Sequence, residues 1–169
     1  MIHAIVNGCG PGWMRLPETT PSKARELIRV FRSMDRKGDD NAHLLMKICT
    51  MCGPLEQAAF EHAVYCSAQN AGSVFRYLNA YDAPHRVIPE KVFPHGADLP
   101  CSWIVLHPES EAVSKRLAAF LGAFARTGDP SLPNLNWAPF SAACETMIID
   151  DCCRIECDPT RPYREAMSL

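Results

Sequence analysis

The chain has 169 residues, 47% of them hydrophobic and 21% charged, which is the composition of a folded globular protein and excludes a disordered one. Its 17 Lys and Arg residues form no block or stripe and its formal net charge is −2, so we expect no nucleic-acid partner. No apolar run approaches the roughly 18 residues of a membrane span, and residues 1–8 lack the basic start of a signal peptide; we therefore expect no membrane segment and a cytoplasmic location.

The first predicted helix follows an irregular N-terminus. Residues 1–17 show no clear hydrophobic period. Thr20 is a suitable capping residue, and Pro21 fits the first helical turn, so the two predict a helix start. The apolar residues that follow recur at helical spacing and predict a face directed at the core: Ala24, Leu27, Ile28, Phe31 and Met34.

Two further helices are predicted next along the chain. Asp39 or Asp40 is suited to cap the first of these, and Gly53 is suited to end it. The other helix is expected to begin at Pro54 and to end near Gly72.

A strand, a long loop and another helix follow. Residues 73–81 alternate and are rich in aromatic side chains, which predicts a strand. Residues 82–109 are rich in proline and predict a long loop, and long loops in small domains are usually functional. A helix is then expected from Ser110 to Gly128, with an apolar face made of Val113, Leu117, Phe120, Leu121 and Phe124.

The C-terminal part predicts the rest of a small sheet. Residues 145–150 read as a strand that residues 154–156 extend, and residues 158–169 are polar and are expected to be a loose tail. The whole chain, 1–169, is predicted to be one α/β domain in which several helices pack on a sheet of two or three strands.

Three segments of the second half resemble the C-terminal part of a type-B carboxylesterase, the lipase and cholinesterase branch of the α/β-hydrolases. They are Phe-Pro-His-Gly-Ala-Asp-Leu-Pro at 93–100, Phe-Ala-Arg-Thr-Gly-Asp-Pro-Ser at 124–131 and Trp-Ala-Pro-Phe at 137–140. The resemblance implies a partial α/β-hydrolase fold and assigns the role of catalytic base to His95. It places Asp98 where most members have Glu, in a supporting role.

The other two members of the hydrolase triad are missing from the sequence. No Gly-x-Ser-x-Gly occurs, so the nucleophile elbow of the family is absent. Ser73 and Ser102 lie nearest the matching segments, but neither has the glycines of that elbow. The family's acid precedes the histidine by a distance that would place it before Met1. The resemblance therefore implies a truncated hydrolase that retains only its histidine segment.

The nine cysteines include one Cys-x-x-Cys, formed by Cys49 and Cys52. Such a pair serves either as a redox centre or as half of a zinc site. A redox pair needs a helix N-terminus to lower the thiol pKa, whereas this pair falls at the end of a predicted helix. Cys152, Cys153 and Cys157 lack the spacing of a zinc ribbon. We therefore expect buried free thiols, no metal site and no cofactor.

Three functions remain open at this stage. In the first, the chain is a hydrolase-like protein without ester hydrolase activity of its own. In the second, it is a non-hydrolytic isomerase or cyclase, or a binding protein for a small apolar ester-like ligand, and it uses His95 as acid and base. In the third, it is a scaffold or a subunit that complements a partner hydrolase. Helices that lack the rest of a hydrolase sheet would leave apolar surface and a strand edge exposed. We therefore expect a homodimer or a partner hydrolase subunit.

Overall fold

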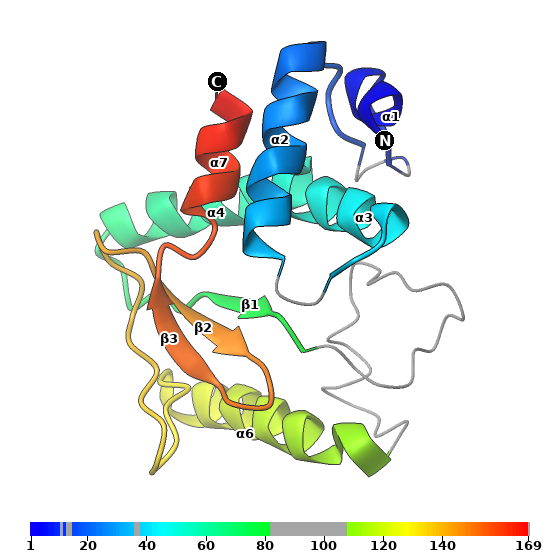
Figure 1. Cartoon of the computed structure of the whole chain (residues 1–169). Coiled ribbons are helices and arrows are strands. Elements are labelled where there is room, and N and C mark those ends of the chain that lie inside the picture. The colour runs from blue at the N-terminus through cyan, green and yellow to red at the C-terminus, as the bar shows by residue number, and fades with distance from the viewer. Residues whose placement is uncertain (11, 13–14, 36–37, 82–107, 169) are drawn as a thin grey trace. The chain divides into compact units, whose positions relative to one another are not determined.

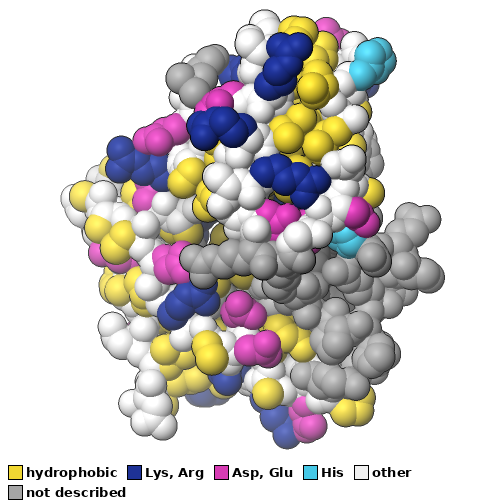
Figure 2. Space-filling model, in the orientation of Figure 1, with side chains coloured by type: hydrophobic (Ala, Val, Ile, Leu, Met, Phe, Trp, Pro, Cys, Tyr) yellow, Lys and Arg dark blue, Asp and Glu magenta, His cyan; other side chains and the backbone are white. Residues whose placement is uncertain are grey.

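A computed structural model describes residues 1–10, 12, 15–35, 38–81 and 108–168 (Figure 1). These residues fall into two units: Met1–His62 with Thr160–Leu169, and Ala63–Pro159. Among the described residues, no helix is both long enough and apolar enough to cross a membrane. On the face drawn in Figure 2, basic and acidic side chains are interspersed among the described residues, with no large area of a single charge.

The first unit is helical. Its elements are α1 (Ile2–Val6), α2 (Pro21–Met34), α3 (Asn41–Cys52), the start of α4 (Pro54–Ala68) and α7 (Arg161–Ser168). Their shared core consists of Ile5, Leu16, Ala24, Leu27, Phe31, Leu44, Ile48, Cys49, Cys52 and Ala166. Of the predicted stripe on α2, Ala24, Leu27 and Phe31 are buried in this core and Ile28 packs against it, whereas Met34 is 41% exposed.

The starts of α2 and α3 follow from local capping. Thr20 Oγ1 accepts a hydrogen bond from Lys23 N at 3.2 Å, with Pro21 as the first helical residue, as predicted. Of the two aspartates proposed for α3, Asp40 is the cap, because its Oδ1 accepts from the main-chain N–H groups of Ala42 and His43 at 3.0 and 2.9 Å. Gly53 follows the last residue of this helix.

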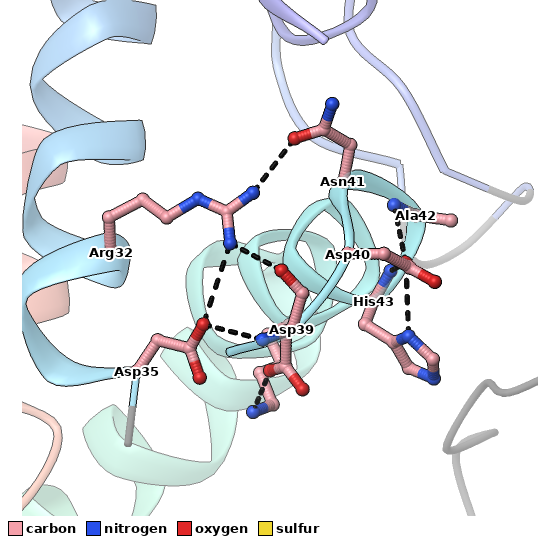
Figure 3. A network of polar contacts seen from close by, with 8 residues as sticks. Arg32, Asp35, Asp39, Asp40, Asn41, Ala42 and His43 are labelled. Carbon is pink, nitrogen blue, oxygen red and sulfur yellow. Dashed lines mark hydrogen bonds and ion pairs between the residues drawn. The ribbon is translucent and has the colours of Figure 1, made fainter. Parts of the chain in front are cut away.

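Polar contacts hold the end of α2 to the start of α3 (Figure 3). Arg32, near the C-terminus of α2, reaches across with its guanidinium: Nη1 donates to the main-chain oxygen of Asp39, and Nη2 donates to Asn41 Oδ1 at 2.8 Å. Asp35 Oδ2 accepts from Asp39 N at 2.7 Å. The α2–α3 connection is therefore fixed by hydrogen bonds to both its main chain and its side chains.

The two ends of the chain are more ordered than the sequence suggests. Residues 2–6 form α1, which is too short to show a hydrophobic period, and Thr19 N donates to Val6 O at 3.1 Å to hold its end. The expected loose tail is instead helix α7. Tyr163 of α7 stacks on Phe31 at 4.4 Å between ring centroids, and Ala166 is buried, because one side of the short helix is apolar.

The second unit is a three-stranded sheet with one helix packed on it. Its strands β1 (Tyr77–Asn79), β2 (Glu145–Ile149) and β3 (Arg154–Cys157) lie in the order β1-β2-β3. β1 is parallel to β2, with Tyr77 opposite Met147, and β3 is antiparallel to β2, with Ile155 opposite Met147. A short 3-10 turn, η2 (Pro108–Ser110), leads into helix α6 (Glu111–Thr127). The expected sheet of two or three strands has three, and within this unit one long helix, α6, packs on it.

The core of this unit lies between the sheet and α6. Its buried members are Tyr81, Val113, Leu117, Phe120, Trp137, Met147 and Ile149. Met147 and Ile149 alternate along β2 and so project to the same face as each other, which is the face covered by α6. Three residues of the predicted apolar face of α6 therefore lie in the core of the second unit: Val113, Leu117 and Phe120.

Two strand boundaries differ from the prediction. The expected strand 73–81 is shorter in the structure, Tyr77–Asn79: Arg76 O still accepts from Met147 N at 2.9 Å, but Val74 O accepts from Phe140 N at 2.7 Å, outside the β1–β2 ladder. Residues 154–157 do not prolong β2 but return beside it as β3 after a turn at 150–153.

Replacing the α2 cap tests this local account. We expect Thr20→Ala to lower the free energy of unfolding by about 1 kcal/mol, because Lys23 N loses its acceptor. Urea denaturation measures the change. Thr20→Ser keeps a hydroxyl at the cap and should stay within about 0.5 kcal/mol of the wild type. Equal losses in the two variants would show that the hydroxyl does not act as a cap.

Candidate functional site

The two residues implicated by the carboxylesterase resemblance, His95 and Asp98, lie outside the described residues. The described chain that flanks them, however, shows where their segment is attached. The segment that contains His95 and Asp98 follows Tyr81, which lies just beyond β1. The described chain resumes at Pro108, just before α6.

Tyr81 is tied to the end of the sheet. Ala80 N donates to Ile149 O at 2.9 Å, which continues the β1–β2 pairing beyond β1, and Tyr81 N donates to Asn79 Oδ1 at 3.2 Å. The Tyr81 ring is buried in the core of the second unit. Its hydroxyl donates to Ser110 Oγ at 3.4 Å, which joins the two attachment points. The described residues Tyr81 and Ser110, on either side of 82–107, are thus in contact beyond the carboxyl end of β1.

The second matching segment, 124–131, forms the end of α6 and the turn after it. Gly128 adopts φ of 76°, a left-handed conformation that suits glycine, and its N–H donates to Phe124 O at 2.8 Å. Thr127 Oγ1 donates to Ala123 O at 2.9 Å and accepts from Asp129 N at 3.1 Å. These contacts end the helix. Their role is structural.

The turn through Asp129 and Ser131 positions the third matching segment, 137–140. Asp129 Oδ1 accepts from Ser131 N at 2.8 Å, a bond that lowers the pKa of this carboxyl group. Ser131 Oγ then accepts from Trp137 N at 3.0 Å. The Trp137 ring packs edge-on against Phe120 of α6 at 5.0 Å between centroids. The two segments therefore act together to seat a tryptophan on the helix.

Phe140, the last residue of the third segment, connects this part of the chain to the approach of β1. It is buried, and its N–H donates to Val74 O at 2.7 Å. Phe75, the next residue, packs edge-on against Trp137 at 6.4 Å. The matching segments 124–131 and 137–140 thus support the sheet and helix to which the His95 segment is attached.

No described serine has the setting of a hydrolase nucleophile. Ser110 and Ser114 are buried on α6 or at its start, and Ser114 Oγ has no hydrogen-bond partner among the described residues. A serine inside a regular helix lacks the strained strand–turn–helix bend that exposes the family nucleophile. Ser73 lies on an exposed stretch before β1, and Ser102 is outside the described residues.

The Cys-x-x-Cys lies in the last turn of α3, as predicted, and both thiols are buried. Burial, with a further contribution from the neighbouring Cys9 thiol, raises the pKa of Cys49 to about 12. Burial also raises the pKa of Cys52 to about 12, and the charge of Glu56 adds to this shift. These values oppose a reactive thiolate. Within the described ranges, no group of three His, Cys, Asp or Glu side chains is placed to hold a metal ion.

A histidine–carboxylate pair that the sequence did not suggest occurs at the start of α3 (Figure 3). His43 Nδ1 lies 3.0 Å from Asp40 Oδ1. The same carboxylate accepts two main-chain N–H bonds, and the bond from His43 N is the main cause of its lowered pKa. Asp40 therefore acts as a helix cap, and its spacing of three residues from His43 is the signal that could have predicted the pair.

The burial of the thiols predicts their reactivity. At pH 8, a pKa of about 12 leaves about one Cys52 in ten thousand as thiolate. Iodoacetamide should therefore modify the exposed Cys152 and Cys157 at least tenfold faster than Cys49 or Cys52 in the folded chain. The difference should disappear in denaturant. Peptide mapping after timed alkylation measures it, and equal rates in the folded chain would contradict the buried placement.

Comparison with known proteins identifies the fold. No protein-family model matches the chain, and no curated protein matches it significantly in sequence. A carboxylesterase of Geobacillus stearothermophilus, solved at pH 6.2, matches 84% of this chain with a TM-score of 0.58 and 21% identity, over 31% of its own length. An esterase from anaerobic Clostridium hathewayi, described as able to hydrolyse aliphatic aromatic polyesters, matches 84% of this chain with a TM-score of 0.52 and 21% identity, over 30% of its own length. The chain spans less than a third of either esterase, and its fold is similar to that of part of these two structures.

Proposed function

We propose that this chain supplies the histidine-bearing part of a carboxylesterase site and has no ester hydrolase activity by itself. One observation carries the proposal: the segment with His95 is attached at the carboxyl end of β1 in a carboxylesterase-like fold. In open α/β sheets, ligands bind beyond the carboxyl ends of the parallel strands. The hydrogen bond between Tyr81 and Ser110 supports this placement, since it keeps both ends of the segment at that edge.

The chemistry assigned to His95 is that of a general base. A neutral imidazole, with a pKa of about 6.5, accepts the proton of a serine hydroxyl as the serine oxygen attacks the ester carbonyl carbon. The imidazolium then returns that proton to the departing alcohol. Both transfers need a nucleophile within about 3 Å, together with an acid and oxyanion donors. The sequence offers a base but no nucleophile elbow, so the nucleophile must come from outside these 169 residues.

The form of assembly that we propose is a complex with a second chain, either a partner hydrolase subunit or another copy. Two features of the second unit support this. β1 pairs only with β2 among the described strands, so one side of it is an edge of the sheet. Leu121 and Phe124, which complete the predicted apolar face of α6, are 37% and 47% exposed, whereas Val113, Leu117 and Phe120 are buried. A chain that covers Leu121 and Phe124 would bury the rest of this face.

Ester turnover tests the catalytic proposal. The purified chain should hydrolyse p-nitrophenyl butyrate at the uncatalysed rate, and His95→Ala should leave that rate unchanged. A histidine alone supplies at most about 10²–10⁴-fold and has no nucleophile to activate here. Turnover that His95→Ala and a serine-directed phosphonate both abolish would refute the proposal. A His95-dependent conversion of a ligand without ester turnover would favour the isomerase or cyclase alternative.

Light scattering coupled to size exclusion tests the assembly. At micromolar concentration the chain should exceed the monomer mass or bind a hydrophobic dye, and Phe124→Glu should reduce either signal because it places a charge on the exposed part of α6. Tyr65→Glu is the matched control, since Tyr65 is an exposed aromatic residue on α4, and it should change neither signal. A monodisperse monomer that binds no dye would mean that this face needs no cover.

A further inference from the structure

Two thiols that are distant in sequence meet in the first unit. Cys9 lies in the loop after α1, and Cys49 lies in the last turn of α3. Their Sγ atoms are 3.4 Å apart, and Cys49 Sγ also lies 3.6 Å from the Cys9 main-chain oxygen. The loop around Cys9 is held in place, since Leu16 N donates to Cys9 O at 2.9 Å. The contact thus joins two fixed parts of the unit.

The geometry points to an intramolecular disulfide between Cys9 and Cys49, a modification site that forms when the chain meets a small-molecule disulfide such as oxidised glutathione. A disulfide bond is about 2.05 Å long, so the two sulfur atoms need to approach by only about 1.3 Å.

Cys52, the other thiol of the Cys-x-x-Cys, is less well placed to react with Cys49. Its Sγ lies 4.0 Å from the main-chain oxygen of Tyr163, on α7. Cys52 thus has a partner of its own, whereas Cys49 is already in contact with Cys9. A bond within the Cys-x-x-Cys is therefore not the one that the structure favours.

The reaction proceeds by two thiol–disulfide exchanges. Cys9 is partly exposed, and its thiolate attacks one sulfur of oxidised glutathione, which forms a mixed disulfide and releases one glutathione. Cys49 loses its proton and attacks the Cys9 sulfur, which closes the protein disulfide and releases the second glutathione. The two protons lost by the protein thiols are taken up by the two glutathione thiolates. The protein pair is oxidised by two electrons, and oxidised glutathione is reduced by two.

The order of these steps follows from burial. Cys49 is 2% exposed, so a bulky oxidant reaches Cys9 first. The high pKa of the buried Cys49 makes its attack the slower step at neutral pH. The rate of ring closure should therefore rise about tenfold per unit of pH between pH 7 and 8.5, and the mixed disulfide on Cys9 should accumulate at the lower pH.

The test oxidises the full reduced chain with excess oxidised glutathione and maps its tryptic peptides by mass spectrometry. We expect residues 1–15 cross-linked to residues 48–76. The bond closes a loop of about 40 residues, so the midpoint of thermal unfolding should rise by roughly 5–10 °C on oxidation. Dithiothreitol should reverse both changes.

Single variants decide which thiols take part. Cys9→Ser and Cys49→Ser should each abolish the cross-link and the thermal shift, while Cys52→Ser and Cys66→Ser, the matched controls from the same peptide, should retain both. Cys9→Ser removes a partly exposed thiol and keeps the test valid if the buried Cys49→Ser does not fold. A cross-link that survives Cys9→Ser, a bond within residues 48–76 alone, or no cross-link at any pH tested would overturn the assignment.

Discussion

The second unit depends on the burial of β2, the middle strand of its sheet. Each residue from Thr146 to Ile149 is buried, although the two strands beside β2 are partly exposed. Met147 and Ile149 pack into the core with α6, while Thr146 Oγ1, on the opposite side of the strand, accepts a hydrogen bond from the buried Arg76 at 2.8 Å. A strand buried on both faces is what a parallel sheet requires, and it is unusual for so small a sheet. Because β1 is aligned by its pairing with β2, the place where the His95 segment is attached also depends on this strand.

The carboxylesterase-like segments at 124–131 and 137–140 have structural roles that can be stated residue by residue. They end α6 at Gly128, form the turn through Asp129 and Ser131, and place Trp137 on Phe120. None of these contacts requires a hydrolase nucleophile. The roles that these contacts show are therefore structural, and a fold does not by itself imply a chemistry.

Sequence reasoning succeeded where short-range physics decides the structure. Capping chemistry located the starts of α2 and α3, hydrophobic spacing located the buried residues of α6, and the Cys-x-x-Cys lies at a helix end with both thiols buried, as expected. It failed where tertiary contacts decide: α1 is too short for a period, α7 is ordered by its packing on Phe31, and the main chain before β1 bonds to Phe140 rather than to a strand. The proximity of Cys9 to Cys49 is also invisible in sequence, because the fold of the whole helical unit creates it. The assignment of His95 and Asp98 rests on the sequence resemblance and remains a prediction.

Amide hydrogen exchange of the full chain tests the central role of β2 most directly. Exchange-protected amides report hydrogen bonds that open only when a cooperative unit unfolds. The account predicts that the amides of Thr146–Ile149 exchange most slowly in the second unit, more slowly than those of Arg154–Cys157 in the adjacent edge strand β3. If the amides of β2 exchange as fast as those of β3 or of the exposed residues 71–73, the sheet does not form around a buried central strand, and the proposed attachment of the His95 segment loses its foundation.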